Sequence, residues 1–378
     1  MRIAEQRFRS FAHIDWFLLV AALSISILGL VTMRSFADEN AFFERHLVWI
    51  GIAVCVFFIA SLPSYHFLRR TPVIVALYGA VVGALALLFV LGVVVKGARE
   101  RFDLGLFFVQ PSDPAKIAII ALLAKYFSRR HIAIAHFRHI FVSGAYAFVI
   151  FVLVFFQPDL GSALIIAFIW LGMVLVAGIS WKHLAGLMIG AVIVSGAAWN
   201  WGLEDYQQTR ILSFLHPLTD IQGAGYNAYQ STVAVGSGEF IGKGIGYGTQ
   251  SKLRFLPEYQ TDFIFASFAE EWGFVGVLIL FCLFAVVIIR ILRHAFRAGD
   301  NFDSLFAMGL AIYILAQFAI HVGMNIGLLP ITGTTLPFMS YGGSHLITEY
   351  LALGILMGMR RRAHPRTAAS YEVDLVGS

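Results

Sequence analysis

The chain has 378 residues, of which 59% are hydrophobic and only 13% are charged, and its mean hydropathy is +0.80. Soluble globular domains carry about 25% charged residues, so this composition excludes an ordinary soluble enzyme and is typical of a polytopic membrane protein. The formal net charge of +5 needs no nucleic acid as a partner, because anionic membrane lipids are sufficient to balance it.

Ten long apolar runs follow one another along the chain, and several of them carry no charge over 20 or more residues. Such runs are long enough to cross a hydrocarbon core as helices, in which every backbone amide finds an internal partner. We therefore predict an all-α, polytopic integral membrane protein with about ten transmembrane helices in a single domain over residues 1–378. The run 114–127 is the weakest, because it is short and contains Lys116 and Lys125. The runs are 14–33, 47–62, 72–95, 114–127, 140–156, 160–181, 184–203, 263–289, 304–329 and 342–359.

Basic residues are distributed unevenly between the two faces that ten spans create. The face that holds both ends of the chain collects 17 of the 27 Lys and Arg residues. The positive-inside rule therefore predicts cytoplasmic termini, as short tails 1–13 and 360–378, and a long outer loop 204–262 before the eighth span.

The other ten basic residues lie on or near the predicted outer face, where topology does not require them. They accompany carboxylates at the ends of spans, namely Asp113, Asp159 and Asp262. Ionisable groups near membrane depth are costly and usually functional, which favours an anionic substrate at this leaflet over loop solubility and charge neutralisation. These basic residues are Arg34, Arg45, Lys96, Arg99, Arg101, Lys116, Arg210, Lys243, Lys252 and Arg254.

The stretch LPEYQTDFIFASFAEE, residues 256–271, concentrates acid where a polar loop enters an apolar run. A helix N-cap is the simplest role for Asp262. If the helix begins early, Glu258 shares a face with Asp262. Glu270 lies about 80° around the helix from Asp262, so these two are also expected to line one cavity, with Glu271 on the opposite side.

Four stretches combine proline with polar residues at the same predicted membrane level. They are QPSDPAK at 110–116, QPDLG at 157–161, LPITG at 329–333 and LPFMSYGGS at 336–344. Each alone reads as a helix-breaking turn. Their repetition at one level predicts that they meet in a shared site.

Nucleotide and zinc sites are not supported by the motifs. Gly242-Lys243 lacks the preceding glycine and the following Ser or Thr of a Walker A loop, since Ser237 and Gly244 stand there. The cluster of His131, His136 and His139 has no Cys or acidic companions. The glycines of the outer loop are expected instead to permit tight turns and re-entrant backbone over a cavity.

Several motifs together resemble the SEDS family of bacterial cell-wall proteins, which comprises RodA, FtsW and their sporulation relative. They are QPSDPAK, QPDLGSA, LPEYQTDFIFASFAEEWGFVG, GLLPITGTTLPFMSYGGS, and QQTRILSFLHP with GAGYNAYQS and VGSGEFIGKG. The resemblance runs through nearly the whole chain, and the RILSFLHP and GAGYN stretches look more like the elongation branch than the division branch.

The resemblance implies a ten-helix peptidoglycan glycosyltransferase that polymerises lipid II at the outer leaflet of the bacterial inner membrane during cell-wall elongation and shape control. A class B penicillin-binding protein is the expected partner, within the elongation machinery. By the family pattern, Asp262 is the catalytic base and Asp113 takes the position of the acid in QPSE. Lys116, Asp159 and Arg210 match the lysine after that motif, the aspartate of QPDLG and the arginine before LSFLNP, and are expected in the substrate site.

One segment departs from the family pattern. In KGARERF at 96–102, the family arginine falls on Glu100 and its tryptophan on Arg101. Either a neighbouring arginine takes over the substrate contact or the loop has a different shape, so Arg101 is kept as a candidate, together with Lys243 and Glu258. Asp113 and Asp159 either orient Lys116 or bind a divalent cation such as Mg or Mn.

Three alternatives to an elongation polymerase remain open at this point. A flippase or transporter of lipid-linked precursors also fits ten spans and interior charges. A division paralogue of the FtsW type would carry the same chemistry. A structural scaffold leaves the acids at membrane depth unexplained.

Overall fold

The computed structural model describes residues 14–34, 41–95, 98–103, 105, 108–129, 137–203, 208–209, 212, 214–215, 225–253 and 255–360. The helices are α2 (Trp16–Arg34), α3 (Ala41–Ser61), α4 (Thr71–Leu91), α5 (Ser112–Ser128), α6 (Phe137–Phe155), α7 (Leu160–Ala177), α8 (Trp181–Trp201), α10 (Tyr226–Ser237), α11 (Thr249–Lys252), α12 (Ile264–Phe296), α13 (Asn301–Asn325) and α14 (Gly343–Arg360), with a 3-10 helix η1 (Tyr65–Arg69). The strands are β1 (Val93–Val95), β2 (Ala98–Asp103) and β3 (Phe108–Val109).

Each of the ten predicted runs contains a long helix, which confirms the all-α polytopic architecture. Eight helices of the described part are long and apolar enough to cross a membrane. The other two long helices are α5, which has 17 residues and carries Asp113 and two lysines, and α14, which carries Glu349. Asp113, Lys116 and Glu349 are buried in the bundle, whereas Lys125 is partly exposed near the end of α5.

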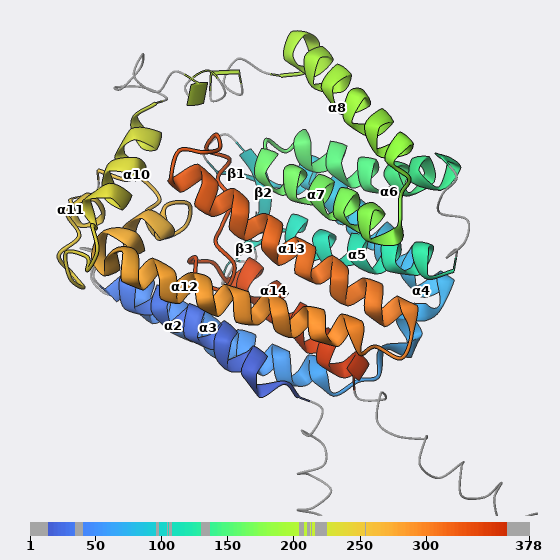
Figure 1. Ribbon diagram of the computed structural model, residues 1–378, viewed down its shortest axis with the longest axis horizontal. Coiled ribbons are helices and arrows are strands. Elements are labelled where there is room, and N and C mark those ends of the chain that lie inside the picture. Colours follow the sequence, from blue (N-terminus) through green and yellow to red (C-terminus); the bar gives the residue numbers. More distant parts are fainter. Residues whose placement is uncertain are drawn as a thin grey trace, which may run out of the picture.

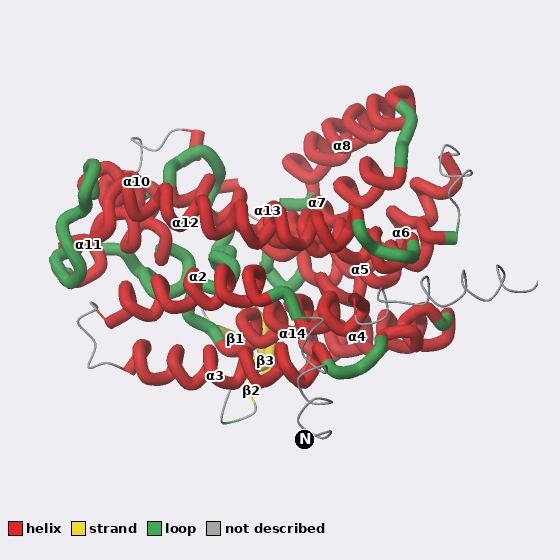
Figure 2. The backbone as a smooth tube through the Cα atoms, turned by 60° about the horizontal axis from the view of Figure 1, so that its bottom comes forward, coloured by secondary structure: helices red, strands yellow, loops and turns green. Residues whose placement is uncertain are grey.

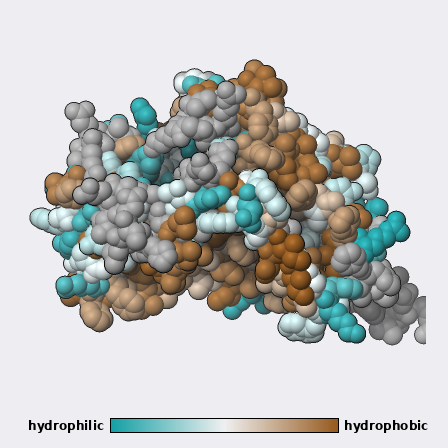
Figure 3. Space-filling model, turned by 90° about the horizontal axis from the view of Figure 1, so that it is seen from above, coloured by the Kyte–Doolittle hydropathy of each residue, from teal (hydrophilic) through white to brown (hydrophobic). Residues whose placement is uncertain are grey.

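Helix α13 lies in the middle of the bundle, with α12 on one side and α7 on the other (Figure 1). In its most apolar window, 67% of the residues are buried, against 0% in α8, which projects from the edge of the bundle. Apolar side chains also cover broad areas of the face in Figure 3. A surface of this kind suits contact with lipid rather than water.

A small antiparallel sheet replaces the end of one predicted helix. The run 72–95 was expected to be helical throughout, but α4 ends at Leu91 and Gly92 donates its amide to the carbonyl of Leu88. The next residues, Val93–Val95, pair with β2, which pairs in turn with β3. The prediction was wrong here because three successive β-branched residues after a glycine suit a strand once a pairing partner is close by.

Helix α12 is interrupted at Gly273, whose φ of 63° and ψ of −167° are not helical. The amides freed by this break, of Phe274 and Val275, donate to the carbonyls of Glu239 (2.9 Å) and Phe240 (3.1 Å). The loop before α11 thus lies in the break and satisfies its backbone. The apolar run predicted a continuous helix, since periodicity alone does not reveal a partner from another segment.

The loop and the break approach each other backbone to backbone, which requires glycine on both sides. A Cβ at Gly273 would overlap the amide nitrogen of Gly242, and a Cβ at Gly242 would overlap the carbonyl oxygen of Glu271. Both glycines also have positive φ. The positive φ values agree with the expected tight turns, and the close approach to α12 is a further role for the glycines of this loop.

Gly273→Ala is therefore expected to lower the free energy of unfolding by roughly 2–5 kcal/mol, from left-handed strain and from displacement of the loop. Gly83→Ala in α4 is the matched control, because nothing lies within 4 Å of a Cβ built there. The control should be neutral or stabilising by up to about 1 kcal/mol. Thermal unfolding in detergent measures both, and equal midpoints for the two variants would contradict the packing argument.

Candidate active site

The segment that joins α13 to α14 enters the core of the bundle instead of crossing its surface. Leu336, Phe338 and Ser340 are fully buried, and loop segments are visible inside the bundle near α2 in Figure 2. Phe338 has a φ of 61°, which is unusual for a bulky side chain. Its carbonyl accepts a 2.7 Å hydrogen bond from Ser26, and its amide donates to Glu349 Oε2 at 2.7 Å.

Asp262 lies where this loop meets the entrance to α12. The carbonyl of Asp262 accepts from Asn325 Nδ2 at 3.0 Å, and the neighbouring carbonyl of Thr261 accepts from Ser340 Oγ at 2.8 Å. Asp262 is partly exposed, and Gly333 faces its carboxylate, since a Cβ built there would lie 3.5 Å from Oδ2. Because residue 333 is a glycine, it places no side chain in the space beside the Asp262 carboxylate.

The spacing of Glu258 and Asp262 allowed α12 to begin early, but it begins only at Ile264. Its N-cap is Phe263, and the preceding residues form turns in which the carbonyl of Glu258 accepts the amides of Thr261, Asp262 and Phe263. The Glu258 carboxylate accepts from Thr261 Oγ1 at 3.2 Å. Asp262 therefore precedes the helix and is held by its backbone.

Asp159 connects the beginnings of two helices. It is the N-cap of α7, where Oδ1 accepts from the amide of Ser162 at 2.8 Å. Its other oxygen accepts from Gln110 Nε2 at 3.1 Å and from Ser112 Oγ at 3.3 Å, at the start of α5. One carboxylate oxygen of Asp159 thus caps α7, and the other holds QPSDPAK against QPDLG.

Asp113 and Lys116 form an ion pair inside the bundle. Lys116 Nζ lies 3.2 Å from Asp113 Oδ1, and the two side chains are 4% and 5% exposed. The ammonium also lies 5.9 Å from the centre of the Tyr313 ring. In the described part of the chain, Asp113 Oδ2 is buried without a hydrogen-bond partner. A buried charged pair with one unsatisfied oxygen is costly and is expected at a functional position.

The four stretches that combine proline with polar residues do meet. Gly161 packs against Thr332 of LPITG and against the following Thr334, because a Cβ built at 161 would lie 3.0 Å from the carbonyl oxygen of Thr332 and would overlap Thr334. The amide of Gln110 donates to Ser344 Oγ at 3.1 Å. The loop between α13 and α14 also carries Gly333, which faces Asp262. The segments that hold Asp113 and Asp159 therefore meet the segment that holds Asp262 at one end of the bundle.

Glu270 does not face the same space as Asp262, so that prediction was wrong. It is fully buried, and its Oε1 accepts from Lys243 Nζ at 2.6 Å and from Thr249 Oγ1 at 2.9 Å. Its Oε2 accepts from the amide of Gln250 at 3.1 Å. The helical angle was compatible with either arrangement, and the loop that folds over α12 provides the donors that take this carboxylate. Lys243 was a candidate to bind the phosphate of the substrate, but its ammonium group is paired with Glu270.

Glu270→Gln is expected to lower stability by on the order of 3 kcal/mol, because an amide nitrogen would face the donors that the carboxylate now accepts. Glu239→Gln is the matched control, since that side chain is exposed. Hydrogen exchange of the amides of 243–250 measures the effect, and unchanged protection in Glu270→Gln would show that Glu270 does not hold the loop.

The remaining candidates occupy different positions. Arg101 is exposed on β2, opposite Val93. Arg210 lies outside the described residues. Sequence reasoning missed Asn325 and Glu349, which hold Asp262 and the buried loop. The acid at 349 inside the apolar run 342–359 was a signal that could have identified one of them.

Among the described residues, the two carboxylates Asp113 and Asp159 offer one oxygen without a hydrogen-bond partner, Asp113 Oδ2, which is too few donors for a divalent cation. No group of three or more His, Cys, Asp or Glu residues in the described chain is arranged to hold a metal ion. Mg²⁺ prefers six oxygen ligands, whereas Asp159 has both oxygens engaged and Asp113 pairs with Lys116. Of the two roles considered for these aspartates, the geometry favours orienting Lys116 and the start of α5.

Comparisons with known proteins cover nearly the whole chain. The sequence model of the FTSW_RODA_SPOVE family, described as "Cell cycle protein", matches residues 7–364. The chain is 35% identical to peptidoglycan glycosyltransferase MrdB of Escherichia coli, over 92% of this chain and 93% of the relative. It is also 35% identical to stage V sporulation protein E of Bacillus subtilis, over 92% and 97%. A probable peptidoglycan glycosyltransferase FtsW of Thioalkalivibrio is 37% identical, over 93% and 90%.

Solved structures agree with these relatives. The rod shape determining protein RodA of Thermus thermophilus superposes with a TM-score of 0.70 at 29% identity, covering 93% of this chain and 98% of that one. A chain of a peptidoglycan synthase complex, described as coordinating polymerization and crosslinking, superposes with a TM-score of 0.80 at 32% identity and the same coverage. The chain belongs to the FtsW/RodA/SpoVE family, which is the SEDS family that its motifs resemble.

Proposed function

We infer that this chain is a peptidoglycan glycosyltransferase that polymerises lipid II, with Asp262 as the catalytic base. The observation that carries the assignment is the convergence of QPSDPAK, QPDLG and the buried loop around the entrance to α12. This arrangement sets a partly exposed carboxylate among elements that also hold the buried Lys116. Relatives over more than nine tenths of the chain are named peptidoglycan glycosyltransferases, which supports the same chemistry here.

The reaction joins two lipid-linked sugars. Asp262 accepts the proton of the acceptor 4-hydroxyl, whose oxygen attacks the donor anomeric carbon with inversion and forms the β-1,4 bond. The bond from that carbon to undecaprenyl pyrophosphate breaks, and the leaving group takes the electron pair. Cations stabilise the charge that grows on it. Lys116 is assigned to this task because α5 begins among the elements that converge on the entrance to α12, and Arg210 and Arg101 are assigned to it by position in the sequence.

The orientation of the chain in the membrane is inferred from the distribution of basic residues. Asp262 precedes α12, whereas Arg290, Arg293 and Arg297 lie at the far end of the same helix. The positive-inside rule assigns the arginine end to the cytoplasm and Asp262 to the periplasmic side of the bacterial inner membrane. Both termini then lie in the cytoplasm, and the loop 204–262 faces the periplasm as part of the same single domain.

A class B penicillin-binding protein is the proposed partner, because a matched structure belongs to a complex that coordinates polymerization and crosslinking. The similarity to RodA and MrdB supports a role in elongation and shape control, with division of the FtsW type as the second candidate.

Reconstitution tests the function directly. Purified protein in vesicles that present lipid II on both leaflets is expected to produce glycan polymer, detected by gel separation of labelled product. A flippase redistributes lipid II and makes no polymer, so transport without polymer would sink the assignment. Elongation and division are separated by asking which depletion phenotype, loss of rod shape or filamentation, the gene rescues.

A further inference from the structure

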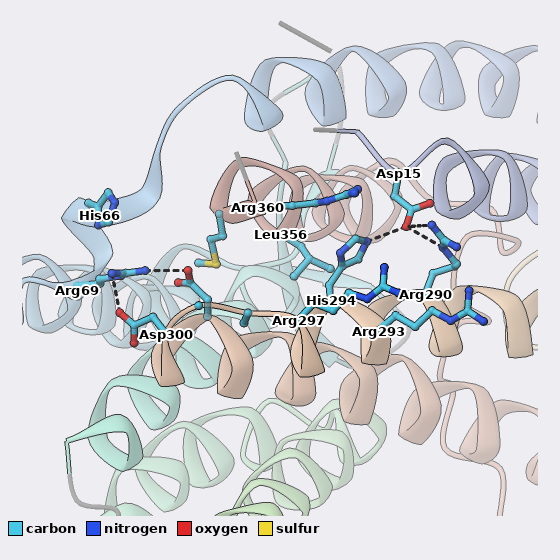
Figure 4. A pocket seen from close by; sticks show the side chains of 14 residues that line it. Asp15, His66, Arg69, Arg290, Arg293, His294, Arg297, Asp300, Leu356 and Arg360 are labelled. Atoms are coloured by element: carbon cyan, nitrogen blue, oxygen red, sulfur yellow. Dashed lines mark hydrogen bonds and ion pairs between the residues drawn. The ribbon is translucent and has the colours of Figure 1, made fainter. Parts of the chain in front are cut away.

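A cavity of about 710 Å³ opens at the end of the bundle opposite Asp262 (Figure 4). Residues from η1, the C-terminal ends of α12 and α14, and the N-terminal end of α13 line it. Its size is within the range of small-molecule sites, which is about 300–1,000 Å³. The polymerisation reaction described above uses none of its residues.

One wall is built by an ion pair between the start of α2 and the end of α12. Arg290 lies 2.6 Å from Asp15 Oδ2, and His294 Nε2 lies 2.8 Å from the same oxygen. Burial opposes the negative charge of Asp15, but the hydrogen bonds from His294, Arg290 and the amide of Leu18 hold the pKa of this carboxyl well below its usual range. Asp15 therefore stays ionised and anchors this wall.

The opposite wall is a second ion-paired cluster. Arg69 of η1 lies 2.6 Å from Asp300 and 2.8 Å from Asp303, at the start of α13. Figure 4 shows the two clusters at the two sides of the cavity, with side chains of α12 and α14 between them. The acids of the cavity are thus used to fix its walls.

The middle of the cavity is cationic and has an apolar floor. Arg293 and Arg297 follow Arg290 at helical spacing, are exposed, and have no carboxylate within ion-pairing distance in the described chain. Leu356 and Arg360 of α14 face them across the cavity. The lining contains five arginines and three aspartates, an excess of two positive charges (5 − 3 = 2) with histidines neutral. Guanidinium groups bind phosphate through paired hydrogen bonds, so the chemistry selected is a phosphate group.

Exposed apolar side chains lie beside the arginines that line this cavity. Phe17 is 72% exposed and lies under the Arg290 guanidinium, 5.2 Å from it. Phe296 and Ile289 on α12 are 77% and 49% exposed. Aromatic and cationic residues gathered at a helix end are typical of the membrane interface. A soluble phosphate would gain nothing from this apolar border, whereas a phospholipid would cover it with its acyl chains.

We propose that this cavity binds the phosphate headgroup of an anionic phospholipid, with Arg293 and Arg297 as its principal contacts and with the acyl chains along Phe17 and the end of α12. The site lies at the other membrane surface from Asp262, so the lipid it selects is a bilayer component of that leaflet and is separate from the polymerised substrate.

The test compares Arg293→Gln/Arg297→Gln with Arg129→Gln/Lys182→Gln, a control that removes two exposed charges at the same end of the bundle but outside the cavity. The probe is phosphatidylglycerol titrated in detergent, with phosphatidylcholine and glycerol 3-phosphate in parallel, and the readout is the thermal unfolding midpoint. Phosphatidylglycerol is expected to raise the midpoint of the wild type and the control alike. In the cavity variant its apparent affinity falls about thirtyfold, and about fivefold in Arg297→Gln alone.

Three results would overturn the proposal. An equal loss of affinity in the control would mean that only diffuse surface charge attracts the lipid. An equal response to phosphatidylcholine, whose headgroup is zwitterionic, would remove the selectivity for an anionic headgroup. A shift by glycerol 3-phosphate as large as that by phosphatidylglycerol would assign the site to a soluble phosphate. If the double variant fails to fold, the single Arg297→Gln variant carries the same comparison.

Discussion

Asp262→Asn is expected to lower the rate of lipid II polymerisation by about 10²–10⁴-fold while leaving a folded, membrane-inserted protein. The amide has the shape of the carboxylate but does not accept the proton of the acceptor hydroxyl. Folding is expected to survive because backbone groups hold this residue, through the bonds of its amide to Glu258 and of its carbonyl to Asn325. Polymer formed by purified protein, with initial rates from labelled lipid II, measures the loss.

Glu44→Gln is the matched control for this variant. Glu44 is an exposed acid in the first turn of α3, at the same end of the bundle, so the substitution removes one negative charge from that end without touching the site. Its rate should remain within about twofold of the wild type, as for surface substitutions in general. Substantial polymerisation by Asp262→Asn, or an equal loss in Glu44→Gln, would refute the assignment of Asp262 as base.

Lys116→Met is expected to have the largest effect on stability, a loss of about 3–5 kcal/mol, because it leaves the buried charge of Asp113 without its partner. Polymerisation should fall with it, since removal of one preorganised charge at a developing anion typically costs about 10²–10³ in rate. Thermal unfolding and polymer synthesis are measured on the same preparation.

The double variant Lys116→Met/Asp113→Asn separates the two effects. With both charges removed, most of the stability should return, since the cost of the single variant comes from one uncompensated charge. Activity should stay low if Lys116 stabilises the leaving pyrophosphate. Recovery of polymer synthesis together with stability would show instead that the pair is only structural.

The class of protein and most of its spans follow from the sequence because the bilayer imposes a one-dimensional rule. A segment of about 20 apolar residues must be a helix wherever it occurs, whatever packs against it. The ten runs accordingly contain the ten long helices. The weakest of these runs, 114–127, also forms a helix, and its Lys116 pairs with Asp113 inside the bundle.

The same rule gives no information where backbone from two segments meets. Whether α12 continues through Gly273 depends on carbonyls of Glu239 and Phe240, more than thirty positions earlier in the chain. Whether Glu270 faces Asp262 or the loop 243–250 depends on donors from that loop. Helical geometry fixed the angle between the two acids but could not choose between these partners.

The sequence by itself determined the membrane class, most of the helical spans and the motifs of the family. Each of these depends on local composition or on residues close together along the chain. Tertiary structure alone decided that Glu349 and Asn325 hold the loop and the aspartate, that Lys243 is committed to Glu270, and that arginines from separate helix ends form one cavity. These outcomes depend on hydrogen bonds and charges between distant segments, whose strength is set by distances that only the folded chain defines.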